Sequence, residues 1–173
     1  MTIVVPAATS RRAFLGGVAG LIATARLSGA AADSAKPAND FAITAARARV
    51  SLVGKPYPDT DVWSYDARVP GPELRVRQGE PARIIVKNNL TEDTTVHWHG
   101  IRLPIGMDGV PGISQPPIKP GDSFAYEFTP PDAGTFWYHP HADSLQQLGR
   151  GMAGALIVEE PQPVPVDRDV VWV

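Results

Sequence analysis

The sequence predicts an all-β fold, either an antiparallel β-sandwich or a barrel. Short segments with alternating or β-branched residues recur along the chain, and helical periodicity is almost absent. The 173 residues include 18 prolines and 16 glycines, which interrupt the chain too often for long helices. This length suits one domain with a real hydrophobic core, plus short extra segments.

The expected strands follow one another at short intervals from residue 41 onwards. They lie at residues 41–52, 62–65, 74–77, 82–87, 94–98, 124–128, 135–139 and 153–158. The alternation is clean in the third of these strands, where Leu74 and Val76 are expected to face inward. Residues 143–148 are expected to form one helical turn.

Three further segments complete the expected organisation. Residues 100–121 form a long connection rich in Pro and Gly, and connections of this length inside a compact domain are usually functional. Residues 161–165 resemble a linker, and residues 170–173 are expected to begin another apolar strand. This order favours a chain that is the front part of a longer protein.

All four histidines of the chain occur in two pairs, His97-Trp98-His99 and His139-Pro140-His141. Side chains two residues apart on a strand point to the same face, so each pair directs two imidazoles one way. Imidazole is a ligand for copper, zinc, iron and nickel. A single such pair is as well explained by ordinary core or surface histidines. Two pairs, with no histidine elsewhere, favour a metal site formed by neighbouring strands.

The absence of cysteine excludes a disulfide and also excludes one kind of copper centre. A blue-copper (type 1) site requires a Cys thiolate beside two histidines, so this chain alone cannot form one. The formal charge is -2, and basic residues are not clustered, so a nucleic-acid partner is not expected.

The first 32 residues have the order of a signal peptide. Arg11-Arg12 precedes Phe14-Leu15 and a weakly apolar run, and small residues follow at 28–32. The adjacent arginines resemble a twin-arginine signal, which predicts export to the periplasm. The alternative is a membrane anchor, but the run is too short and too rich in Gly and Ala to span a bilayer well. No stable anchor is therefore expected.

The two histidine motifs resemble those of the multicopper oxidases, the family that includes laccases and bacterial copper oxidases. Segments around the pairs agree with the family as well: Asp108-Gly109-Val110-Pro111-Gly112, Gln115-Pro116-Pro117-Ile118, Pro120-Gly121 and residues 151–158. The likeness covers roughly residues 41–173. It implies a cupredoxin-like Greek-key antiparallel β-sandwich at residues 33–160, the first of two or three such domains. Residues 161–173 would be the linker and the start of the next domain.

The resemblance also implies roles for individual residues in a three-copper cluster that reduces dioxygen to water. His97 would bind the type 2 copper, His99 and His139 one type 3 copper, and His141 the other. Asp108 matches an acidic residue that helps to move protons, although an Asp that favours a tight Asp-Gly turn explains it equally well. Trp98, Trp137 and Tyr138 are expected to be core aromatics rather than electron carriers.

The partners implied are dioxygen, a reducing substrate, and further cupredoxin domains or subunits that carry the remaining ligands. The 173 residues alone are expected to be inactive as an oxidase, because they hold half of the cluster and no type 1 site. A non-enzymatic periplasmic copper-binding or carrier module is the main alternative. A relative that has lost its copper is less favoured, since all four ligands of this domain are present.

Overall fold

The structure, a computed structural model, describes residues 39–173. The predicted signal peptide at 1–32 lies outside the described residues. Neither helix within residues 39–173 has the length and apolar character that a bilayer crossing requires.

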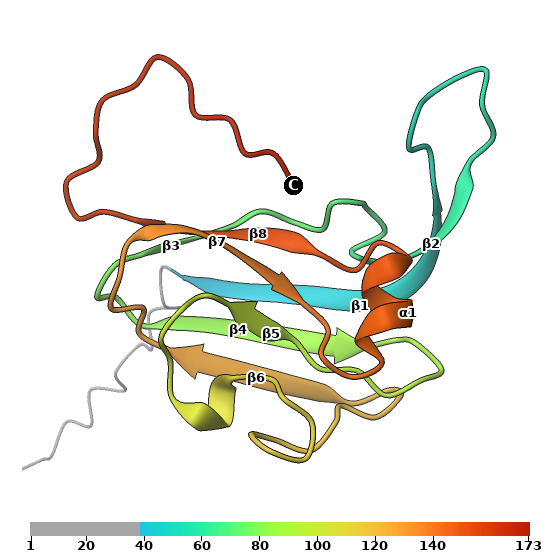
Figure 1. Cartoon of the computed structure of the whole chain (residues 1–173), viewed down its shortest axis with the longest axis horizontal. Helices are drawn as coiled ribbons and strands as arrows, with labels where there is room; N and C mark the ends of the chain where they lie inside the picture. Colours follow the sequence, from blue (N-terminus) through green and yellow to red (C-terminus); the bar gives the residue numbers. More distant parts are fainter. Residues whose placement is uncertain (1–38) are drawn as a thin grey trace, which may run out of the picture. The chain divides into compact units, whose positions relative to one another are not determined.

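The regular secondary structure of the described chain is almost entirely β-strand, as predicted (Figure 1). Its elements in order are β1 (Asp40–Val50), β2 (Thr60–Tyr65), β3 (Leu74–Arg77), β4 (Ala82–Asn88), β5 (His97–His99), the 3-10 helix η1 (Ile105–Met107), β6 (Ser123–Phe128), β7 (Gly134–His139), α1 (Ser144–Gly149) and β8 (Gly154–Glu159). The single α-helical turn therefore also falls where the sequence placed it.

The strands form two four-stranded sheets, in the orders β2-β1-β4-β6 (sheet A) and β3-β8-β7-β5 (sheet B). The sheets are mixed rather than purely antiparallel, because β1 pairs with β4, and β3 with β8, in parallel. Parallel neighbours need a crossover instead of a hairpin. The chain supplies it by leaving sheet A for β3 before it returns as β4. The sandwich prediction is confirmed, and the purely antiparallel pairing is corrected.

The core lies between the two sheets and follows the alternation of each strand. Leu74 and Val76 are 2% and 0% exposed, as their pattern predicted. Trp98 is fully buried, and its ring lies 5.3 Å from that of Tyr126 in β6 and 5.7 Å from that of Tyr138 in β7. The Trp98–Tyr126 contact joins the two sheets directly behind the strands that carry the histidines, and the Trp98–Tyr138 contact lies within sheet B.

Two expected strands differ from the structure. The fifth is shorter than predicted, because Thr94 makes only an isolated bridge to Ile118 and regular pairing starts at His97. Residues 170–173 form no strand, so that prediction is wrong for the described chain. Their backbone pairs with no described strand, and Trp172 is 90% exposed. The apolar β-branched pattern favours a strand, but a strand also needs an edge to pair with.

Candidate metal centre

The two histidine pairs are brought together by the pairing of β5 with β7. These strands are antiparallel, with His97 opposite His139 and His99 opposite Trp137. Trp98 and Tyr138 point into the core and are fully buried, so the histidines next to them point to the other face of sheet B. The alternation that forms the core thus places the imidazoles together on the outside.

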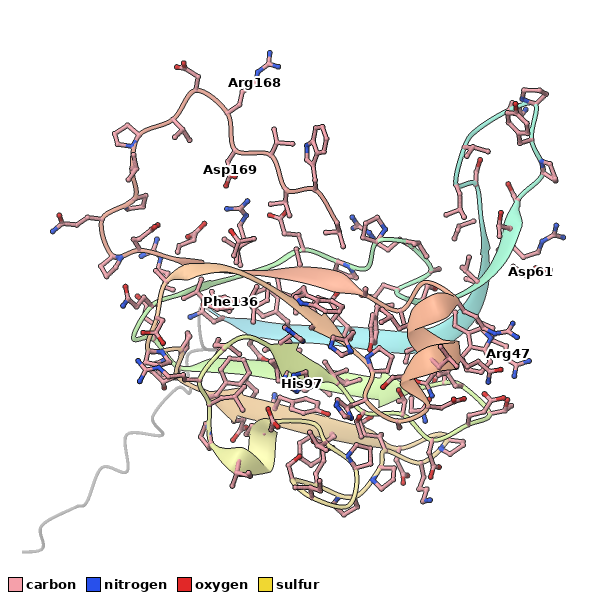
Figure 2. All side chains as sticks on the ribbon, in the orientation of Figure 1. Arg47, Asp61, His97, Phe136, Arg168 and Asp169 are labelled. Atoms are coloured by element: carbon pink, nitrogen blue, oxygen red, sulfur yellow. The ribbon has the colours of Figure 1, made fainter. Side chains whose placement is uncertain are left out.

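His97, which is labelled in Figure 2, lies close to each of the other three histidines. Its ring centroid is 5.6 Å from that of His99, 5.4 Å from that of His139 and 5.5 Å from that of His141. The His139 side chain is buried, His97 is partly buried, and His99 and His141 are exposed. The structure therefore gathers all four predicted residues around one point that is open on one side.

Three of the four residues have nitrogens close enough for a single ion. Ligand atoms of His97, His99 and His139 all lie within 4.8 Å of one another. His99 Nδ1 and His139 Nε2 are 3.4 Å apart. Two nitrogens about 2.0 Å from one metal at a tetrahedral angle would be about 3.3 Å apart, so this pair fits a shared ion. His141 is adjacent to this group of three but outside it.

The remaining ring nitrogens of His97 and His139 face backbone carbonyls. His97 Nδ1 lies 2.7 Å from the carbonyl oxygen of Asp108, and His139 Nδ1 lies 2.9 Å from that of Pro140. A carbonyl only accepts, so each Nδ1 carries the hydrogen and each Nε2 keeps its lone pair in the neutral ring. Contacts of this kind fix the tautomer and orientation of metal-binding histidines.

The loop that supplies the Asp108 carbonyl is pressed against β5 by Gly109. Gly109 has φ +76°, and a Cβ there would lie 1.8 Å from the carbonyl oxygen of Val96. Only glycine allows this approach. The sequence pattern points to the carboxylate of Asp108 and to a turn at Asp108-Gly109, but the Asp108 carbonyl makes the shorter contact with His97. The Asp108 carboxylate oxygen Oδ1 is 3.3 Å from His97 Nδ1.

Sheet A also supports the first histidine pair. The Tyr126 hydroxyl accepts a hydrogen bond of 2.8 Å from the buried backbone N–H of Val96, the residue before His97. Burial raises the pKa of Tyr126 to about 12, so the hydroxyl stays neutral. The sequence places Tyr126 only within the expected strand 124–128; nothing in the pattern indicates that its hydroxyl holds β5.

Helix α1 connects the segments that carry the two pairs. Gln147 is fully buried; its side chain accepts a hydrogen bond of 2.7 Å from the Thr94 hydroxyl and donates one of 2.8 Å to the Asp93 carbonyl. The His141 backbone N–H donates to the Thr95 hydroxyl over 3.3 Å. The chain beyond β7 is therefore tied to the chain entering β5. A Gln inside a short polar helix gives no sequence signal for this role.

The three aromatic residues within the motifs do not behave alike. The expectation of a core position is confirmed for Trp98 and Tyr138. It is wrong for Trp137, which is partly exposed and lies outside the buried core. Its ring stacks on that of His139 at 4.2 Å between centroids and lies 4.9 Å from that of His99. Trp137 faces outward because it is two residues from His139 on the same strand.

The electrostatics of the cluster favour neutral imidazole at its most buried member. Burial lowers the pKa of His139, and the nearby rings of His97, His99 and His141 lower it further. The neutral ring is the form that binds a metal. The donor set, the free Nε2 atoms and the 3.4 Å nitrogen pair all fit a copper ion.

Comparison with known proteins points to one family. The family model described as "Multicopper oxidase" matches residues 46–163. Copper resistance protein A of Escherichia coli is 38% identical over 93% of this chain and 28% of its own length. A copper resistance protein A homolog of Pseudomonas syringae pv. tomato is 36% identical over 95% of this chain and 29% of its own length. The chain thus spans less than a third of these relatives.

Solved structures give the same result. The multi-copper oxidase of Pseudomonas thermotolerans is 52% identical, with a TM-score of 0.69 over 72% of this chain and 30% of that chain. The blue copper oxidase of Nitrosomonas europaea is 38% identical, with a TM-score of 0.67 over 73% of this chain and 40% of that chain. The expected cupredoxin-like fold is confirmed by these structures. With a family match over most of its length, this chain belongs to the multicopper oxidase family.

Proposed function

We propose that this chain provides the copper-binding domain of an exported oxidase, with four histidines as its share of a three-copper cluster. The observation that carries the proposal is the 3.4 Å separation of His99 Nδ1 and His139 Nε2 within a group of converging imidazoles. Ordinary surface histidines have no reason to present ligand atoms to one another across two strands.

The proposed assignment gives His97 to the type 2 copper, His99 and His139 to one type 3 copper, and His141 to the other. The close His99–His139 nitrogen pair supports a shared ion for these two residues. The position of His141 outside the group of three supports its assignment to a different ion. The exposed faces of His99 and His141 leave room for dioxygen and for ligands from elsewhere.

When bound, such a cluster supplies electrons that reduce dioxygen to water while a donor substrate is oxidised. The residues of this chain hold and orient the ligands, through the carbonyls of Asp108 and Pro140. We propose that the Asp108 carboxylate also passes protons toward the cluster, since it is partly exposed and lies beside the His97 ring.

The proposal requires partners that carry the rest of the oxidase. The 173 residues contain no cysteine, so the type 1 copper and the choice of donor substrate belong to further cupredoxin domains or subunits. We place the domain at residues 33–160 and assign 161–173 to a linker and the start of a following domain. The twin-arginine pattern within residues 1–32 supports export to the periplasm.

Copper titration of this chain, followed by electron spin resonance, tests the binding step. We expect a Cu(II) signal with nitrogen hyperfine coupling that saturates, and a much weaker affinity after His139→Gln. Gln146→Ala, an exposed change on α1, is the matched control and should leave the affinity unchanged. A chain that binds copper no better than its His139→Gln variant would contradict the proposed site.

Dioxygen uptake with a phenolic or cuprous donor tests the oxidase step and separates it from a copper-carrier role. We expect no turnover from these 173 residues alone. Turnover should appear in the protein that joins them to domains with a type 1 site, and disappear after His139→Gln. Copper binding without turnover in that longer protein would favour the carrier module.

A further inference from the structure

A polar cavity lies away from the histidines, between β1, β2 and the end of α1. Its volume is about 570 Å³, and its lining includes Arg47, Arg49, Asp61, Trp63 and Arg150. Figure 2 shows Arg47 and Asp61 on the side of the sandwich where α1 packs. No histidine lines this cavity, so it is separate from the metal centre.

The charges around the cavity do not cancel. Arg47 Nη2 lies 2.6 Å from Glu92 Oε1, and Arg49 Nε lies 3.1 Å from Asp61 Oδ1. Within residues 39–173, no carboxylate lies within ion-pair distance of Arg150. One guanidinium in the cavity is therefore uncompensated, and both ion pairs are exposed enough for water to weaken them.

The indole of Trp63 arranges two of the three arginines. The Cζ atoms of Arg47 and Arg150 lie 4.9 Å and 5.2 Å from the ring centroid. Trp63 is only 5% exposed, and its backbone N–H donates to the Arg150 carbonyl over 3.1 Å. A guanidinium over an indole face keeps its N–H donors at its edge, where they remain free for an acceptor.

We propose that this cavity binds a small oxyanion, a carboxylate, phosphate or sulfate, between Arg47 and Arg150. Arg47 uses Nη2 for Glu92 and Thr91, which leaves Nε and Nη1 as donors. Arg150 makes no side-chain hydrogen bond to the described residues. Both side chains line the same cavity and lie near the same indole, and a guanidinium with free N–H groups can bind an oxyanion through paired hydrogen bonds. The cavity is also large enough for a small organic acid or phosphate ester.

Titration of the copper-free chain with inorganic phosphate, at an ionic strength held constant with chloride, tests the proposal. The Trp63 indole N–H and the Arg150 Nε–H resonances should shift and saturate together. Arg150→Gln should weaken binding by about tenfold or more, because it removes a charged donor pair. Arg77→Gln removes the same charge from an exposed position on β3 in sheet B and should leave the affinity unchanged.

Arg150→Lys keeps the charge and controls for folding; it should also weaken binding, because it lacks the planar fork. Acetate in place of phosphate distinguishes a carboxylate from a tetrahedral anion, and saturation by either supports the proposal. Shifts that never saturate with either ion, or equal losses in Arg150→Gln and Arg77→Gln, would overturn it. Such results would show general screening of surface charge.

Discussion

The two histidine pairs have the same spacing but are held by different parts of the molecule. The first pair makes up the ends of β5, the three-residue edge strand of sheet B, and is held from outside that sheet by Tyr126 and the Asp108 carbonyl. In the second pair only His139 lies in a strand. His141 lies beyond Pro140 and depends on Thr95 and on helix α1.

The spacing alone points to the residues that we propose as metal ligands, whereas contacts distant in sequence decide how firmly each residue is held. A short edge strand has few ladder hydrogen bonds of its own, so β5 needs support from both sheet A and the 100–121 loop. The second pair extends beyond the end of β7, so His141 needs contacts from outside that strand to hold it in place. Changes in these supports should therefore affect one pair before the other.

Gly109→Ala should have the largest effect, and it should act on the first pair. The added Cβ would lie 1.8 Å from the Val96 carbonyl oxygen, which must move together with β5. We expect the free energy of unfolding to fall by about 3 kcal/mol or more, as for severe overpacking. Denaturant unfolding measures the loss, and copper titration should show weaker binding in whatever folded protein remains.

Gly79→Ala is the matched control for this prediction. Gly79 has φ +78°, close to the +76° of Gly109, but a Cβ there would have no neighbour within 4 Å. It should cost only the strain of a left-handed residue, about 1–2 kcal/mol, and leave copper affinity unchanged. Equal losses in the two variants would show that backbone strain, and not contact with β5, explains Gly109.

Gln147→Leu should have the next largest effect, on the second pair. The Thr94 hydroxyl and the Asp93 carbonyl would lose their buried partner, and each unpaired polar group is unfavourable in the core. We expect a loss of about 2–3 kcal/mol in unfolding free energy. In ¹⁵N spectra of the imidazole rings, the signal of His141 should broaden or move more than that of His99.

Gln146→Leu changes a neighbouring exposed residue of the same helix and should alter stability by about 0.5 kcal/mol or less. If the Gln147 change moved the His99 signal as much as the His141 signal, α1 would support the whole cluster. The contrast between the pairs would then be lost.

Tyr126→Phe should have a smaller effect, and this effect should again fall on the first histidine pair. It keeps the buried ring but removes the acceptor for the Val96 N–H, which is fully buried. We expect a loss of about 1–2 kcal/mol and faster hydrogen exchange at the Val96 amide. Tyr57→Phe removes a hydroxyl from a side chain that is 64% exposed and should change neither quantity.

Much of the fold was predictable because it depends on local alternation. The inward positions of Leu74 and Val76, and the outward positions of the histidines, follow from a period of two residues. The parallel pairing of β1 with β4 was not predictable, because it depends on the path of the chain between sheets. Among the supports of the site, Gln147 and the Asp108 carbonyl were missed. The Asp108 carbonyl is a backbone group that every residue type has. The Gln147 side chain bonds to Asp93 and Thr94, which lie far from it in the sequence, so no local pattern indicates either support.

Acidification should have the smallest effect, and it tests the burial that distinguishes His139 from the exposed His141. The pKa of His139 is lowered in the fold, below the value of about 6.5 of an unstructured histidine. At pH values above the pKa of the unstructured histidine, His139 is neutral in both the folded and the unfolded chain, and its contribution to stability is complete. As the pH falls toward the folded pKa, the unfolded chain takes up the proton first, so the metal-free domain loses stability. Thermal unfolding across this range measures the slope, and His139→Gln should reduce it. An unchanged slope in that variant would mean that burial of His139 does not govern the acid response of the cluster.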